Sequence, residues 1–168
     1  MSNLLEDWLP RVYRFALRLC SDPHVAEELA QDTFLRAWTQ RGRLRDAGAL
    51  RVWLFRITAN LWTDRLRRGR SKVALAGPLE DDALGRCQSP DRLAAGREEL
   101  ARALAAMETL PSRQRQVLYL STCEGLSSAE VAEVLGITAE AAKANLSLAR
   151  KKVRELLPDV FPDPVPRE

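Results

Sequence analysis

The sequence predicts an all-α protein made of two small helical bundles joined by a flexible linker. Apolar residues recur at the period of amphipathic helices through residues 3–70 and again from about residue 92 to residue 157. Between these stretches the period is lost, and glycine, proline and acidic residues accumulate. We therefore expect a first domain over 1–70, a linker over 71–96, a second domain over 97–158 and an extended tail over 159–168.

The first 40 residues contain two helical patterns separated by a break at Ser21-Asp22-Pro23. Pro10 lies inside the first pattern, which predicts that the helix begins at or just after this proline. The second helix is expected from about Pro23 to Thr39. Ser21 or Asp22 can cap it, and proline is favoured at a first helical position.

Residues 51–70 form the next predicted helix, which has two chemically distinct faces. One face is an apolar stripe that includes Leu54 and Ile57. The other face consists of Arg56, Asn60, Thr63, Arg67 and Arg70. Between residues 41 and 72 the chain holds ten basic and two acidic residues, a local charge of +8 in a chain whose total is +3. Charge concentrated in this way favours nucleic-acid binding over a merely solvated helix.

Two segments lack a sustained period. Residues 40–49 hold two glycines and three arginines, which predicts a basic loop between two helices. Residues 73–91 carry four acidic residues and one basic residue, a net charge of −3. Their glycines and prolines predict a linker, and solvation alone would also account for the acidity.

The second domain ends in the clearest supersecondary pattern of the chain. Two helices, near 92–107 and 112–123, precede it. Ser127 and Glu130 have the spacing of a capping box, Gly136 fits the end of that helix, and Thr138 can cap a final helix to about residue 157. This pattern predicts a helix-turn-helix, although a plain αα-hairpin would share it. Five basic residues and no acidic residue lie between 143 and 154, which favours DNA.

Composition argues against several classes of protein. No apolar run approaches the ~18–20 residues of a membrane span, and the first residues lack a signal-peptide layout, so we expect a cytoplasmic protein without membrane insertion. Cys20, Cys87 and Cys123 form no CxxC pair, and His24 is the only histidine. We therefore expect no metal, no cofactor, no catalytic residue and no enzyme activity.

Several strings together resemble the extracytoplasmic-function (ECF, group 4) sigma factors of bacterial RNA polymerase. The string AEELAQDTFLRAW at 26–38 is similar to region 2.2 of that family, and LPSRQRQVLYLSTCEGLS at 110–127 is similar to the start of region 4. The family's −10 reading helix carries WL-x-R-I-A-x-N-x-x-x-D-x-x-R-R. This string stands here as Trp53, Leu54, Arg56, Ile57, Ala59, Asn60, Asp64, Arg67 and Arg68, with Thr58 before the alanine.

The resemblance covers the chain from about Val12 to Leu157 and implies an alternative sigma factor. Such a protein binds core RNA polymerase, through its β′ and β subunits, and directs promoter-specific transcription initiation. Promoter DNA and an anti-sigma factor are the other implied partners. Implied polymerase contacts are Gln31, Asp32, Thr33, Phe34, Arg36 and Trp38. Implied −10 contacts are Arg41, Arg43, Arg45, Arg56, Asn60, Thr63, Asp64, Arg67 and Arg68. Implied −35 contacts are Lys143, Asn145, Ser147, Arg150 and Lys151.

The last helix departs from the family pattern. Glu140-Ala141-Ala142 stands in place of Gly-Thr-Val, and Leu148 in place of an arginine. Either the protein reads an unusual −35 element, or its −35 contact is weak and region 2 carries more of the selectivity. Two alternative functions stay open: a sigma-like decoy that binds an anti-sigma factor, and a conventional DNA-binding regulator that uses only the helix-turn-helix.

Overall fold

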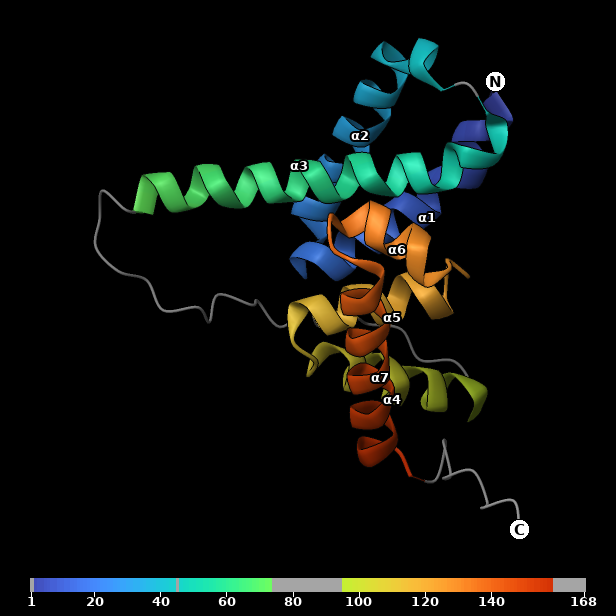
Figure 1. Ribbon diagram of the computed structural model, residues 1–168, viewed down its shortest axis with the longest axis vertical. Coiled ribbons are helices and arrows are strands. Elements are labelled where there is room, and N and C mark those ends of the chain that lie inside the picture. Colours follow the sequence, from blue (N-terminus) through green and yellow to red (C-terminus); the bar gives the residue numbers. More distant parts are fainter. Residues whose placement is uncertain (1, 45, 74–94, 159–168) are drawn as a thin grey trace.

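The computed structural model describes residues 2–44, 46–73 and 95–158, which form helices and no strand (Figure 1). The first unit consists of α1 (Ser2–Cys20), α2 (Pro23–Thr39) and α3 (Leu50–Val73), with single 3-10 turns at Arg41–Arg43 and Ala47–Ala49. The second unit consists of α4 (Ala95–Glu108), α5 (Ser112–Thr122), α6 (Ser128–Leu135) and α7 (Ala139–Leu156). The predicted all-α fold class is confirmed. Most of the predicted linker and the predicted tail lie outside the described residues.

α1 begins at Ser2 and contains Pro10, so the predicted start at the proline is wrong. An internal proline removes one backbone hydrogen bond from a helix. In α1, contacts made by residues before and after Pro10 offset the loss of this hydrogen bond. Trp8, before the proline, meets Phe55 edge-on at a centroid distance of 6.4 Å, and Phe15, after it, is fully buried.

The predicted start of α2 is confirmed. Farther along α2, a buried hydroxyl group forms a contact with a buried hydroxyl group of α3. Asp22 caps α2 by accepting hydrogen bonds from the backbone N–H groups of His24 and Val25. Thr33 Oγ1 donates to the Leu29 carbonyl at 2.7 Å and lies 3.1 Å from Thr58 Oγ1 of α3. Both threonines are 0 % exposed, so the contact sets the register between these two helices.

The predicted helix-turn-helix has its caps where the sequence places them. Ser127 and Glu130 form a reciprocal capping box at the start of α6. Gly136 ends that helix with φ +62°, a left-handed conformation that glycine adopts without steric strain. Thr138 caps α7, because its side chain accepts a hydrogen bond from the Ala141 N–H. α7 then packs on α4, α5 and α6.

Replacing Ser127 with Ala is expected to lower the free energy of unfolding by about 1 kcal/mol, because one backbone N–H of α6 loses its acceptor.

Backbone and hydroxyl donation from Ser127, together with Arg51, lowers the pKa of Glu130. The stabilisation by that carboxylate is therefore complete above its ordinary pKa of 4.5 and disappears as the pH falls through the depressed value. Urea unfolding at neutral and acidic pH measures both effects. Equal stability of Ser127→Ala and the surface control Ser147→Ala would contradict the assignment.

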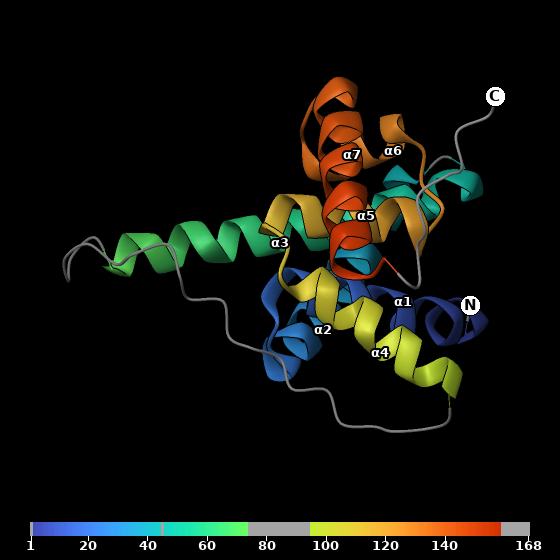
Figure 2. The same cartoon turned by 90° about the horizontal axis from the view of Figure 1, so that it is seen from below.

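The two units pack directly against each other. In both views α6 lies beside α3, while α1 contacts α5 (Figure 2). The ring of Phe15 in α1 meets Phe55 of α3 at 5.2 Å and stacks on Tyr119 of α5 at 6.0 Å. These rings belong to one continuous hydrophobic core that includes residues of both units. The sequence did not predict this docking.

Candidate nucleic-acid interface

A polar groove of about 350 Å³ lies between the end of α2 and the middle of α3. Five of the residues predicted to contact the −10 element line it. They are Arg56, Asn60, Thr63, Asp64 and Arg67. The groove is completed by Arg36, Gln40, Trp53 and Ile57. The structure therefore brings together a guanidinium of α2 and two of α3, one carboxylate, two amides and an indole.

The groove side chains differ in how far they are already engaged. Asn60 and Arg67 are exposed and form no hydrogen bond with another described residue, so their polar groups are available to a ligand. Thr63 Oγ1 donates to the Ala59 carbonyl at 2.9 Å. Arg56 Nη1 lies 2.9 Å from Glu133 Oε1 of α6. Trp53 is half-buried in the groove wall, where an aromatic face can stack on an unpaired base.

Four other predicted −10 residues do not line the groove. Arg68 donates to the Asp64 carbonyl of its own helix at 3.3 Å. Arg41 stacks over the Trp38 ring, with its guanidinium carbon 4.6 Å from the centroid, and donates to the Trp38 carbonyl. The side chains of Arg43 and Arg45 lie outside the described residues.

The predicted polymerase contacts on α2 divide into two faces. Gln31, Asp32 and Trp38 are exposed, whereas Phe34 is half-buried. Thr33 is fully buried and hydrogen bonded within the first unit, so its assignment as a polymerase contact is corrected: it positions α2. Arg36 is also exposed, and it lines the groove.

Leu35 is an exposed residue of α2 that the sequence pattern did not identify as part of a binding surface. Its side chain is 68 % exposed beside Trp38, which is 55 % exposed. Exposed large apolar side chains that lie together mark protein-binding surfaces. The available signal was that Leu35 falls out of phase with the buried residues Leu29 and Ala30 on the same helix.

Four of the residues predicted to contact the −35 element are exposed on α7: Lys143, Ser147, Arg150 and Lys151. Asn145 is different, because it is half-buried and its amide donates to the Ala141 carbonyl at 2.8 Å. Leu148 is 54 % exposed on the same helix. An apolar side chain among lysines suits the methyl group of a thymine in the major groove.

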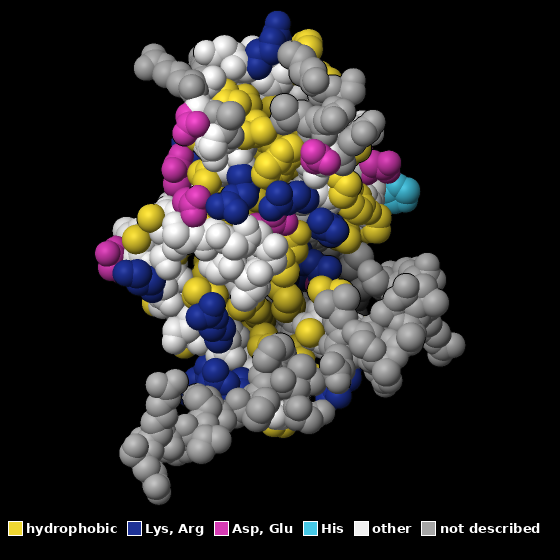
Figure 3. Space-filling view, turned by 90° about the vertical axis from the view of Figure 1, so that its right-hand side faces the viewer, with side chains coloured by type: hydrophobic (Ala, Val, Ile, Leu, Met, Phe, Trp, Pro, Cys, Tyr) yellow, Lys and Arg dark blue, Asp and Glu magenta, His cyan; other side chains and the backbone are white. Residues whose placement is uncertain are grey.

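The remaining sequence features supply no second site in the described part of the chain. No group of three residues there could hold a metal ion, and no described helix could cross a bilayer. The Cys20 thiol lies 3.1 Å from the Ala16 carbonyl, and burial raises its pKa. Cys123 is exposed, and Cys87 lies outside the described residues. Elsewhere on the surface, lysine and arginine side chains lie among hydrophobic and acidic ones across the middle of one face (Figure 3).

Two protein families match different parts of the chain. Residues 4–72 match the family "Sigma-70 region 2" and residues 100–153 match "Sigma-70, region 4". The chain is 36 % identical over 150 residues to the probable RNA polymerase sigma factor RfaY of Xanthomonas campestris, covering 87 % of this chain but only 37 % of that relative. It is 30 % identical over 161 residues to the ECF RNA polymerase sigma factor SigL of Mycobacterium tuberculosis, covering 95 % of this chain and 90 % of SigL.

The fold is also similar to that of a solved sigma factor. RpoE of Bartonella quintana, in complex with the anti-sigma factor NepR, matches with a TM-score of 0.74 and 28 % identity, over 93 % of this chain and 95 % of RpoE. The match to SigL covers nearly all of both chains, and both sigma regions occur here in the order that the sequence predicted. The chain therefore belongs to the extracytoplasmic-function RNA polymerase sigma factors.

Proposed function

We propose that this protein is an alternative sigma factor that binds core RNA polymerase and directs promoter-specific initiation in the cytoplasm, without catalysis of its own. The observation that carries the proposal is the groove between α2 and α3, which is lined by five predicted −10 residues. Two of them, Asn60 and Arg67, are exposed and form no hydrogen bond with another described residue. A conventional helix-turn-helix regulator has no use for this groove.

The groove is suited to the non-template strand of a melted −10 element. Arg36, Arg56 and Arg67 supply three guanidiniums for phosphate oxygens. Trp53 can stack on a base that has left the duplex, and such stacking offsets part of the cost of unpairing. The Asn60 amide can pair with a base edge, because both its donor and its acceptor are free among the described residues.

The outer face of α2 is the proposed polymerase-binding surface. Leu35 and Trp38 supply an apolar centre, and Gln31 and Asp32 supply polar groups on the same helix. A centre of exposed apolar side chains with a polar rim is the usual composition of a protein interface.

α7 is the proposed reader of the −35 element. Lys143, Arg150 and Lys151 can contact phosphates, while Ser147 and Leu148 face the base edges. The leucine in place of the family arginine shifts recognition from a guanine edge toward a thymine methyl group. An anti-sigma factor is a further proposed partner, since RpoE has the same fold and is bound by one.

The groove is tested by replacing Arg67 with Ala and, as a matched control, Arg65 with Ala. Both arginines lie on α3, but Arg65 is on the opposite side, where it pairs with Glu28 at 2.6 Å. Loss of one phosphate contact is expected to reduce the slope of log affinity against log salt by about 1 and to weaken promoter binding several-fold.

Promoter binding by the reconstituted holoenzyme should be measured by fluorescence anisotropy at several salt concentrations. Arg65→Ala should behave as the unmodified protein does. Equal effects of the two substitutions would show that any positive charge on α3 contributes to promoter binding, and would contradict the groove as the binding site. Absence of core polymerase binding in all variants would overturn the sigma-factor proposal itself.

A further inference from the structure

The contact between the two units is ionic as well as apolar, and its charges are segregated. In the four ion pairs given below, which join described residues of the two units, the arginine belongs to the first unit and the carboxylate to the second. Arg11 pairs with Glu124 at 2.6 Å, Arg51 with Glu130 at 3.2 Å and Arg56 with Glu133 at 2.9 Å. Arg18 pairs with Glu108. We call the second unit's set Glu108, Glu124, Glu130 and Glu133 the acidic face.

Glu124 is the most enclosed member of the acidic face. Its side chain is 3 % exposed and accepts two hydrogen bonds from the Arg11 guanidinium, while the Tyr119 hydroxyl donates to its other oxygen at 3.2 Å. Arg51 also donates to the Glu124 backbone carbonyl at 3.0 Å. A carboxylate this deeply buried needs such partners, and the one charged partner among them, Arg11, comes from the first unit.

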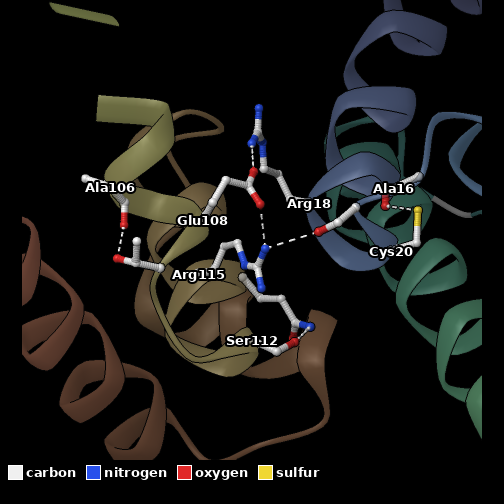
Figure 4. Close-up of polar contacts among 10 residues, drawn as sticks. Ala16, Arg18, Cys20, Ala106, Glu108, Ser112 and Arg115 are labelled. Carbon is white, nitrogen blue, oxygen red and sulfur yellow. Dashed lines mark hydrogen bonds and ion pairs between the residues drawn. The ribbon is translucent and has the colours of Figure 1, made fainter. Parts of the chain in front are cut away.

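A second ionic cluster holds the other end of the contact (Figure 4). Glu108 accepts from Arg18 of α1 and, at 2.8 Å, from Arg115 of its own unit. Arg115 is 2 % exposed, and it also donates to the Ser21 hydroxyl of the first unit at 3.2 Å. The two units are thus joined by ion pairs of Arg11 and Arg18, which precede and follow Phe15 on α1, as well as by the stacked rings of Phe15 and Tyr119.

This closed arrangement is incompatible with reading both promoter elements. The −35 and −10 positions are roughly 25 base pairs apart, or about 85 Å of duplex at ~3.4 Å per pair. α3, with 24 residues, is about 36 Å long at ~1.5 Å per residue, and α6, which precedes the −35 reading helix, rests against it. The units must therefore separate before both elements are bound.

The closed arrangement also occupies part of the proposed −10 site. Arg56 of the groove is paired with Glu133. Asn60 and Thr63 line a second cavity, of about 310 Å³, whose other wall includes Ser112 and Gln116 of the second unit. A carboxylate at Arg56 takes a position that a DNA phosphate would need, because both anions bind the same guanidinium fork.

We propose that the acidic face is an autoinhibitory latch that docks the second unit on the first and competes with promoter DNA for the arginines of α3. The inference rests on the proposed function only for its biological meaning, since the latch itself is a property of the free chain. Opening it releases Arg56 of the groove from Glu133 and frees α7 to reach a distant element.

The test replaces three acids of the latch, in the variant Glu124→Gln, Glu130→Gln, Glu133→Gln. The matched control Glu27→Gln, Glu140→Gln, Glu155→Gln removes the same number of charges from exposed positions outside the contact. Small-angle X-ray scattering of the full chain, without polymerase or DNA, should give a larger radius of gyration for the latch variant only. Circular dichroism should show unchanged helix content in both.

A charge exchange guards against a merely unfolded variant. Glu133→Arg should also expand the chain, and adding Arg56→Glu should restore the compact state, because the pair is re-formed with reversed signs. Binding to an oligo(dT) probe, measured by anisotropy, should tighten several-fold in the latch variant relative to the control. Identical scattering by wild type, latch variant and control would overturn the proposal, whatever the outcome with polymerase.

Discussion

Replacing Asn60 with Ala is expected to reduce specific initiation by about 5- to 150-fold, the range that corresponds to ~1–3 kcal/mol for a lost base-edge contact. The amide is exposed in the groove and forms no hydrogen bond with another described residue, so the substitution should change the free energy of unfolding little. The loss should come with relaxed preference at one base position of the −10 element, because a base-edge contact carries sequence information that a phosphate contact lacks.

Run-off transcription with core polymerase measures this effect, after the promoter has been found by mapping transcripts from genomic fragments. Binding of the variant to core polymerase, measured separately, should be unchanged, since Asn60 belongs to α3 and lines the groove, whereas the proposed polymerase-binding surface consists of α2 residues. Initiation at the wild-type rate, with the wild-type base preference, would contradict a reading role for Asn60.

Replacing Phe15 with Ala is expected to lower the free energy of unfolding by about 3–5 kcal/mol, the cost of truncating a buried phenylalanine. The ring is 0 % exposed and meets Phe55 in the first unit and Tyr119 in the second. For a domain of this size such a loss lowers the melting temperature by roughly 10 °C. Because the ring joins both units, the substitution should also favour the open chain.

Thermal unfolding followed by circular dichroism measures the stability, and scattering measures the opening. Leu9→Ala is the matched control, since Leu9 lies on the same helix and is 45 % exposed. A melting temperature for Phe15→Ala equal to that of the control would mean that the two units do not share a core.

The sequence predicted the elements well wherever local chemistry sets them. The capping box of Ser127 and Glu130, the positive-φ glycine at Gly136 and the cap at Asp22 depend on residues within a few positions, so spacing alone finds them. The helical period likewise placed Arg56, Asn60 and Arg67 on one face, because a helix fixes which side chains share a side.

The same local reasoning was wrong where packing overrides it. Pro10 indicated the start of a helix, but contacts on both sides of it keep α1 continuous. Thr33 was assigned to a partner from its place in a matching string, whereas its burial against Thr58 gives it a structural role. Exposure depends on what covers a side chain, and for Leu35 and Arg36 only the arrangement of the helices decides it.

The sequence by itself determined the all-α class, the helix boundaries set by caps and glycine, the basic face of α3 and membership of the sigma family. The tertiary structure alone decided how the two units meet. Arg11 and Glu124 are 113 positions apart, and Arg56 and Glu133 are 77 apart. No periodicity or motif relates residues at such separations, because their contact depends on the apolar core that brings α1 and α3 against α5 and α6.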